Sequence, residues 1–324
     1  MRFKNWNVLA FVLTLAIYST SALAVEVRYG LWAKEGEAQY IGAQEFKRII
    51  EAESGGKFNV TIYPGNQLGT PREMQTQLAL DTTQIVASGD PGIKDIEYLA
   101  LPYLMKGINN YVALINSPIG EEWNAKLTDQ KKILMLGFLP RSPRQISANK
   151  VINSIDDLSG LKLRAPQRDY YVESLSALGA KPTPMAFKEV YTALQTGVVD
   201  GQENPIETIY AQKFYEVQSG IAMVDYIDKP AYVMIGQIFW NTLSDDEKEL
   251  FQKAQLASQR VVEELMPAQQ TEFIERIRAA GVTITYPDKA PFIEATQSVR
   301  DNLGRKQWGD ELYMQIVEIG KQDL

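Results

Sequence analysis

This chain alternates between two hydrophobic periods along most of its length. Segments such as residues 25–32 and 58–63 alternate apolar and polar side chains one by one, which favours strands. Segments such as residues 40–54 place apolar residues three or four apart, which favours helices. Alternating strands and helices are typical of an α/β fold with mostly parallel pairing. At 324 residues the chain is too long for one typical core, so we expect two lobes.

Local signals predict the remaining elements. A cap followed by proline predicts that a helix begins at Thr70-Pro71. The stretches 132–139 and 231–240 are apolar enough for strands covered on both faces. Residues 200–204 are interpreted as a polar turn, and residues 145–161 as a connection. The other expected elements are strands at 84–88 and 162–164 and helices at 107–117, 118–129, 170–178 and 187–194.

One long helix is predicted in the last third of the chain. Ser244 to Glu247 form a capping box, in which the serine side chain accepts from the first turn and the glutamate bonds back. Apolar residues at helical spacing follow and continue towards Ala280. Pro267 interrupts this pattern, and proline inside a helix costs about 3 kcal/mol, so we expect a kink or break there. Two separate helices are the alternative to one helix that spans both lobes.

The first 24 residues have the pattern of a secretory signal. Arg2 and Lys4 form a basic start, residues 8–18 are apolar, and Ala22 to Ala24 form a small-x-small cleavage site. An uncleaved anchor is the alternative, but the apolar run is short for a bilayer and no stop-transfer pattern follows. We therefore expect a protein that is exported to the periplasm.

Composition excludes several classes of function. The chain has no cysteine and no histidine, so a disulfide framework, thiolate or imidazole metal sites and histidine-dependent nucleophiles are impossible. A net charge of -7 without a basic stripe argues against nucleic-acid binding. We expect no metal and no cofactor.

Three polar residues are the first candidates for a binding site. Arg144 and Arg164 each follow an apolar, strand-like run, and α/β sheets bind ligands at the carboxyl ends of their strands. The arginine fork donates two parallel hydrogen bonds to a carboxylate and stays charged. Asn204 lies before Pro205 and offers both donors and an acceptor. Surface positions or internal ion pairs are the alternative for these residues.

The chain resembles the substrate-binding subunits of tripartite ATP-independent periplasmic (TRAP) transporters, of the DctP type, and is similar to sialic-acid receptors. The resemblance covers nearly all of the chain after residue 24, and the string Asp200 to Pro205 is its most specific part. The other matching segments are Tyr63-Pro64, Gln67 to Gly69, Leu101 to Tyr103, Arg144-Gln145, Ala148 to Lys150, Ile152 to Ser154, Leu161 to Arg164, Pro182 to Phe187, Glu189 to Tyr191, Ala193 to Thr196 and Ala211 to Val217.

The resemblance implies a two-lobe receptor that closes about a hinge around a small organic acid and delivers it to TRAP permease subunits. It implies a first lobe of residues 25–141 and 230–269 and a second lobe of 142–229 and 270–324, with the long helix bracing the hinge. The implied ligand contacts are Arg164 as the main carboxylate clamp, Arg144 as a second contact, Asn204 completing the carboxylate site and Phe187 as an aromatic wall.

The first lobe departs from the sialic-acid pattern. Trp32 replaces a small polar residue, and Tyr29 lies nearby; both could stack on a ligand or belong to the core. Ser88 and Asp90 could bind hydroxyls or form a solvated turn. We therefore expect a hydroxy or sugar-type monocarboxylate. A C4-type dicarboxylate, for which Arg141 and Arg168 are available, and an aromatic acid are the alternatives.

Other classes of function remain as alternatives. An exported hydrolase would need a carboxylate pair such as Asp200 with Glu203, or Glu35 with Glu37. The receptor of an ATP-driven importer would share the two lobes but not the string from Asp200 to Pro205, and a periplasmic sensor could bind the same ligand. We expect a monomeric receptor that is not an enzyme.

Overall fold

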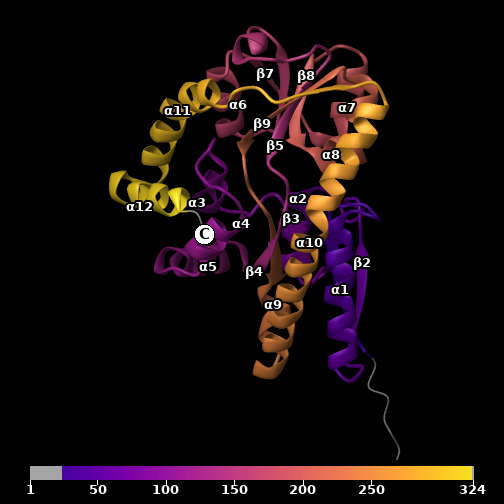
Figure 1. The fold of residues 1–324 in the computed structure, drawn as a ribbon. Helices are drawn as coiled ribbons and strands as arrows, with labels where there is room; N and C mark the ends of the chain where they lie inside the picture. Colours follow the sequence, from indigo (N-terminus) through magenta and orange to yellow (C-terminus); the bar gives the residue numbers. More distant parts are fainter. Residues whose placement is uncertain (1–23, 323–324) are drawn as a thin grey trace, which may run out of the picture.

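The computed structural model describes residues 24–322, which form two β-sheets with helices around them (Figure 1). The signal predicted at residues 1–24 lies outside this part of the chain, except for its last residue. Within the described part, no helix has the length and apolar character needed to cross a membrane. The α/β prediction with two lobes is confirmed, and we call the parts built on the first and second sheets the first and second lobe.

The first sheet has the strand order β2-β1-β3-β10-β4. Its strands are β1 (Val25–Leu31), β2 (Phe58–Tyr63), β3 (Ile85–Ser88), β4 (Ile133–Leu139) and β10 (Ala231–Gly236). All residues of β10 are buried, as predicted, but the middle of β4 is only half-buried. Tyr29 lies in the core with its ring centroid 5.6 Å from that of Phe46, so it is a packing residue.

The second sheet has the strand order β11-β9-β5-β8-β6-β7. Its strands are β5 (Arg144–Ala148), β6 (Lys162–Ala165), β7 (Lys181–Pro184), β8 (Gly201–Pro205), β9 (Gly220–Ile227) and β11 (Thr283–Thr285). Each sheet described here contains one strand that is antiparallel to both of its neighbours, β10 in the first and β5 in the second, and the other pairings are parallel. Each of these two strands is the first after the chain has crossed from one sheet to the other.

Several sequence predictions for the second sheet are wrong. Residues 201–205 form the buried strand β8 instead of a turn, and residues 144–148 form the buried strand β5 instead of a connection. Arg144 therefore lies at the start of a strand and not after its end. Because β5 is antiparallel to β8, Arg144 still pairs with Pro205, at the carboxyl end of β8.

Helices surround both sheets. The described helices are α1 (Ala38–Glu53), α2 (Pro71–Ala79), α3 (Lys94–Glu97), α4 (Ile108–Ile115), α5 (Pro118–Lys131), α6 (Asp169–Ala177), α7 (Val190–Gln195), α8 (Ile206–Ala211), α9 (Gln237–Thr242), α10 (Asp245–Ala279), α11 (Ala290–Trp308) and α12 (Asp310–Lys321), with short 3-10 turns between some of them. The strand predicted to reach residue 240 ends at Gly236, where α9 follows.

The long helix α10 runs along both lobes (Figure 1). It packs on α1 and β4 in the first lobe and on α8 and β11 in the second. The predicted capping box is present, since Ser244 Oγ accepts from the Glu247 amide at 3.3 Å and Glu247 accepts from the Ser244 amide at 2.8 Å. The helix continues through Pro267, so of the expected kink or break the break does not occur, and a single helix spans both lobes.

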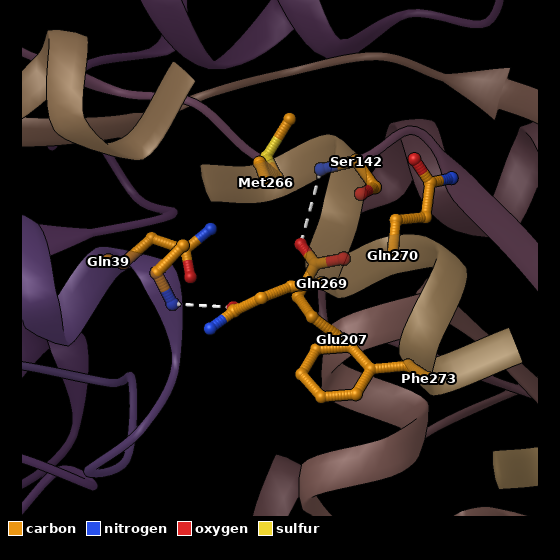
Figure 2. A pocket seen from close by; sticks show the side chains of 8 residues that line it. Gln39, Ser142, Glu207, Met266, Gln269, Gln270 and Phe273 are labelled. Carbon is orange, nitrogen blue, oxygen red and sulfur yellow. Dashed lines mark hydrogen bonds between the residues drawn. The ribbon is translucent and has the colours of Figure 1, made fainter. Parts of the chain in front are cut away.

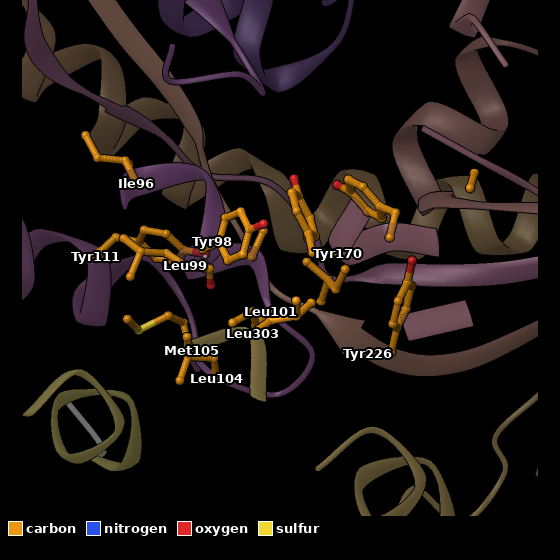
Figure 3. Close-up of a cluster of buried hydrophobic side chains, with 14 of the residues drawn as sticks. Ile96, Tyr98, Leu99, Leu101, Leu104, Met105, Tyr111, Tyr170, Tyr226 and Leu303 are labelled. Carbon is orange, nitrogen blue, oxygen red and sulfur yellow. Dashed lines mark hydrogen bonds between the residues drawn. The ribbon is translucent and has the colours of Figure 1, made fainter. Parts of the chain in front are cut away.

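The largest hydrophobic cluster joins the two lobes (Figure 3). Tyr98 and Tyr111 come from the first lobe, whereas Tyr170 and Tyr226 come from α6 and β9 of the second. The C-terminal helices also contact both lobes, because α11 packs on α6 and α12 packs on α4. The lobes therefore share apolar contacts in addition to the chain crossings.

Candidate functional site

Arg164 is a buried cation without an ionic partner. It is the third residue of β6, and only 4% of its surface is exposed. Its Nε and Nη2 donate to the Met185 carbonyl at 3.2 and 2.9 Å, and its Cζ lies 5.8 Å from the Phe187 ring centroid. No described carboxylate forms an ion pair with Arg164. Burial lowers the pKa of its guanidinium, as expected for a cation that lacks a counter-ion.

Arg144, in contrast, is paired inside the protein. Its Nε and Nη2 form a bidentate ion pair with the Glu203 carboxylate, with 2.7 Å between Nη2 and Oε1. Nη2 also donates to the Glu203 carbonyl at 2.9 Å. Burial alone would lower the pKa of Arg144, but Glu203 and Tyr171 raise it well above its ordinary value. The Tyr226 hydroxyl donates to Glu203 at 2.6 Å and completes this buried group.

The pairing of β5 with β8 fixes the orientation of Asn204. Its Oδ1 accepts from Arg144 Nη2 at 3.0 Å, so the amide nitrogen faces away from this arginine. That nitrogen donates one hydrogen bond, to Gln202 Oε1 at 2.5 Å, and an amide nitrogen carries two donors. Its second N–H makes no hydrogen bond to a described residue, and only 4% of Asn204 is exposed.

In the turn after β3, the candidates Ser88 and Asp90 lie close together, and both already make polar contacts within the protein. Ser88 Oγ accepts from the Asp90 amide at 3.1 Å, and Asp90 Oδ1 accepts from the Gly92 amide at 2.9 Å. Asp90 Oδ2 pairs with Arg168 Nη2 at 2.5 Å, and Arg168 also lies 3.5 Å from Glu97. Arg168 follows β6, so this ion pair links the two lobes.

The ring of Trp32 packs against the guanidinium of Arg141 at the junction of the lobes. The Arg141 Cζ is 5.0 Å from its ring centroid, and the buried Nε1 of Trp32 has no hydrogen-bond partner in the described chain. Phe187 is 36% exposed and packs edge-on to Phe214 at 6.1 Å. The predicted residues thus fall into two groups: Arg164, Arg144, Asn204 and Phe187 in the second lobe, and Trp32, Ser88 and Asp90 in the first.

Sequence reasoning missed Tyr171 and Lys229. The Tyr171 ring, at the start of α6, lies 5.1 Å from Arg144 Cζ and 5.7 Å from Lys229 Nζ. Burial alone would raise the pKa of the Tyr171 phenol, yet Arg144 and Lys229 lower it, which shows a positive field at this ring. The segment from Tyr170 to Leu178 was correctly predicted as a helix, but a sequence pattern cannot show which cations surround it.

The carboxylates of the hydrolase alternative are engaged elsewhere. Asp200 accepts from the Lys162 amide at 2.8 Å, and Glu203 is paired with Arg144. Glu37 accepts from the Lys34 amide at 2.6 Å. Within residues 24–322, no cluster of three or more potential metal ligands is present.

A small pocket lies where α1, α8 and α10 meet (Figure 2). Glu207 Oε1 accepts from the Ser142 amide at 3.2 Å, and the Ala38 amide donates to Gln269 Oε1 at 2.8 Å. Glu207 Oε2 and Ser142 Oγ are buried without a partner among the described residues. None of the seven predicted ligand residues lines this pocket, so it is separate from the candidate site.

Comparison with known proteins identifies one family. Residues 29–307 match the model of the bacterial extracellular solute-binding proteins, family 7. The chain is 34% identical over 290 residues to the sialic acid-binding periplasmic protein of Vibrio cholerae, covering 88% of this chain and 90% of that protein. It is 31% identical over 276 residues to the C4-dicarboxylate-binding periplasmic protein of Rhodobacter capsulatus, covering 82% of each.

Solved structures agree with this assignment. A TRAP periplasmic solute binding protein from Haemophilus influenzae, with bound L-gulonate, superimposes with a TM-score of 0.82 at 28% identity. The match covers 91% of this chain and 99% of that chain. The resemblance seen in the sequence is therefore confirmed, as is the periplasmic location. The chain belongs to family 7 of the bacterial extracellular solute-binding proteins, the solute receptors of TRAP transporters.

Proposed function

We propose that this receptor binds a hydroxy or sugar-type acid by placing the acid's carboxylate against Arg164, and that it delivers the acid to TRAP permease subunits. The observation that carries this proposal is the buried, unpaired guanidinium of Arg164. A buried charge without a partner is costly, and a ligand carboxylate would supply the missing negative charge. The relatives support this ligand class, since their names and titles specify sialic acid and L-gulonate.

The second lobe is organised to receive that carboxylate. Two hydrogen bonds to the Met185 carbonyl fix the Arg164 guanidinium before a ligand arrives. Arg144 holds the Asn204 amide so that its remaining N–H can donate to the same carboxylate. Arg144 Nη1 makes no hydrogen bond to a described residue and offers one more donor. Because these groups are already oriented, binding costs less conformational entropy.

We assign different roles to the candidates of the first lobe. The Trp32 ring packs against the Arg141 guanidinium, and the exposed part of Phe187 forms an aromatic wall beside Arg164. Ser88 and Asp90 shape the turn after β3, because their polar groups are already bonded within it. A ligand that touched both lobes would favour the closed state.

Closure requires the lobes to move about the chain crossings. We propose lobes of residues 25–141 with 230–269 and of residues 142–229 with 270–324, hinged between β4 and β5, between β9 and β10, and along α10. We also propose that the receptor acts as a monomer.

Isothermal titration calorimetry tests the clamp, with ligands first found by a thermal-shift screen of hydroxy and sugar acids. Losing one buried charge-assisted contact costs about 2–5 kcal/mol, so Arg164→Ala should weaken binding by roughly 30-fold or more. Arg48→Ala, which changes an exposed arginine on α1, should leave affinity unchanged. Unchanged affinity in a folded Arg164→Ala variant would remove the clamp assignment.

A further inference from the structure

Arg164 is not the only cation without an ionic partner at the junction of the lobes, where Lys229 is buried and Arg141 half-buried. Lys229 is 6% exposed, and its Nζ donates to the Gly89 carbonyl at 2.8 Å. Arg141 donates from Nη2 to Thr208 Oγ1 at 3.1 Å, and its buried Nε has no partner in the described chain. Neither cation forms an ion pair with a described carboxylate.

Arg141 and Lys229 converge on one point of the backbone. A Cβ atom added at Gly89 would lie 3.4 Å from Arg141 Nη1 and 4.0 Å from Lys229 Cε. The topology explains this arrangement. Gly89 follows β3, Lys229 precedes β10, and Arg141 follows β4, and β10 is paired with both β3 and β4. The ends of three neighbouring segments therefore meet at the same edge of the first sheet.

Tyr171 connects this pair of cations to the clamp of the second lobe. Lys229 Nζ and Arg144 Cζ both lie within 6 Å of its ring centroid, at 5.7 and 5.1 Å. Arg144 in turn bonds Asn204, which we place in the carboxylate site with Arg164. Lys229, at the crossing from β9 to β10, and Arg144 of the second lobe are thus neighbours around one aromatic ring.

The nearby carboxyl groups do not balance these charges. Glu203 is paired with Arg144 and Asp90 with Arg168. Glu207 and Glu37 face Arg141, but burial raises the pKa of both, that of Glu37 to about 7. Glu97 also faces Lys229, and burial and the Asp90 charge raise its pKa to about 7. At neutral pH Glu37 and Glu97 therefore carry less than full negative charge.

We propose that Arg141 and Lys229 form a second anion subsite at Gly89, which binds a second carboxylate at the end of the ligand remote from Arg164. This inference rests on the proposed function, because it assigns the other end of the same ligand. Two cations that donate only to neutral oxygens and pair with no described carboxylate suit a ligand carboxylate better than a hydroxyl, since only the carboxylate also balances charge. The ligand is then a hydroxylated or sugar-type diacid, and not the monocarboxylate expected from the sequence.

Calorimetry with matched acids tests this subsite. Each pair shares a carbon skeleton and differs in the terminal group: threonate and tartrate, gluconate and glucarate, galactonate and galactarate. We expect the best diacid to bind the wild type at least ten-fold more tightly than its monoacid partner. Arg141→Met and Lys229→Met should each weaken diacid binding ten-fold or more and change monoacid binding less than three-fold. Arg164→Ala should weaken both members of the pair.

A smaller change tests the same place without removing a charge. Gly89 does not need a positive φ, so Gly89→Ala is compatible with the backbone, but its methyl group would occupy the space between Arg141 and Lys229. It should lower diacid affinity selectively, whereas Lys248→Met, which changes a half-buried lysine near the start of α10, should not. Thermal unfolding of every variant shows whether it is folded.

The outcomes separate the two proposals. If monoacids bound the wild type as tightly as diacids, or if Arg141→Met and Gly89→Ala weakened both classes equally, the second subsite would be overturned and the Arg164 clamp would stand. If no acid of either class bound, both proposals would fail. Loss of diacid preference in Arg141→Met, Lys229→Met and Gly89→Ala, with monoacid binding retained, would establish the second subsite.

Discussion

Arg144 and Arg164 carry the same charge and lie in the same sheet, but they differ in their hydrogen-bond and ion-pair partners and therefore in their roles. Arg144 meets a carboxylate, a carbonyl and an amide oxygen from residues 203 and 204, which satisfy most of its donors. Arg164 meets only the Met185 carbonyl and an aromatic ring. One arginine thus holds the site in shape, while the other keeps a charge available for a ligand.

The pH dependence of stability tests how burial changes the pKa of a single residue, Glu37. Burial, together with the Glu207 charge, raises its pKa from 4.5 to about 7. In the folded protein the Glu37 carboxyl therefore stays protonated up to about pH 7, whereas in the unfolded chain it loses its proton near pH 4.5. The contribution of Glu37 to the free energy of unfolding is thus fully present below pH 4.5 and is lost as the pH rises to about 7. In urea unfolding, Glu37→Gln should reduce the loss of stability over this range.

The control for this prediction is Glu35→Gln, a neighbouring exposed carboxyl, which should follow the wild-type pH dependence. The glutamine at position 37 keeps an oxygen that can accept from the Lys34 amide, so local structure is preserved. A constant difference in unfolding free energy between Glu37→Gln and wild type from pH 4.5 to pH 8 would show that Glu37 titrates normally.

At the level of elements, sequence patterns predicted most helices, the strands of the first sheet and β6 with Arg164, but missed β5 and β8, which carry Arg144 and Asn204. Residues 201–205 read as a turn because they are polar and end in proline, yet all five are buried. Their polar side chains are satisfied by partners distant in sequence, such as Arg144 and Ser147, which no local period can reveal. The strand-end pattern and the resemblance both pointed to the two arginines, but which of them is paired internally depends on strand register.

At the contact between α1 and α10, helix propensity and packing predict opposite effects of Gly42→Ala on stability. A Cβ at Gly42 would lie 2.6 Å from Val262 Cγ2 and 3.0 Å from the Ser258 carbonyl. Propensity alone predicts that Gly42→Ala stabilises α1 by about 1 kcal/mol. We expect overpacking to dominate and to destabilise the protein by about 1–3 kcal/mol. Chemical denaturation measures the sign of the change.

Gln44→Ala, on the exposed side of the same helix, is the matched control and should change stability little. A Gly42→Ala variant more stable than the wild type would mean that α1 and α10 can separate without cost, and the close approach of these helices would then not restrain the long helix.

At the scale of the whole molecule, the lobes are connected in several ways that act on closure differently. The crossings beside β5 and β10 and the helix α10 connect the lobes covalently at the hinge that we propose, and the shared core around Tyr98 and Tyr170 adds apolar contact. Arg168 adds charge, since it follows β6 in the second lobe and pairs with Asp90 and Glu97 in the first. This bridge joins the lobes without using the residues that we assign to the ligand.

Removing that bridge should weaken every ligand alike. Exposed ion pairs contribute about 0.2–1 kcal/mol, so Arg168→Gln should reduce affinity by up to about five-fold for monoacids and diacids equally.

Because the native chain has no cysteine, cysteines introduced at the exposed positions 44 and 198 can carry spin labels that report the distance between the lobes. We expect this distance to be longer in the unliganded Arg168→Gln variant than in its parent, and 1 M salt to narrow the difference by screening the bridge in the parent. Arg278→Gln, which breaks an ion pair within α10, should have neither effect. A loss confined to diacids would instead make Arg168 a ligand contact and transfer to it the role that we assign to Arg141.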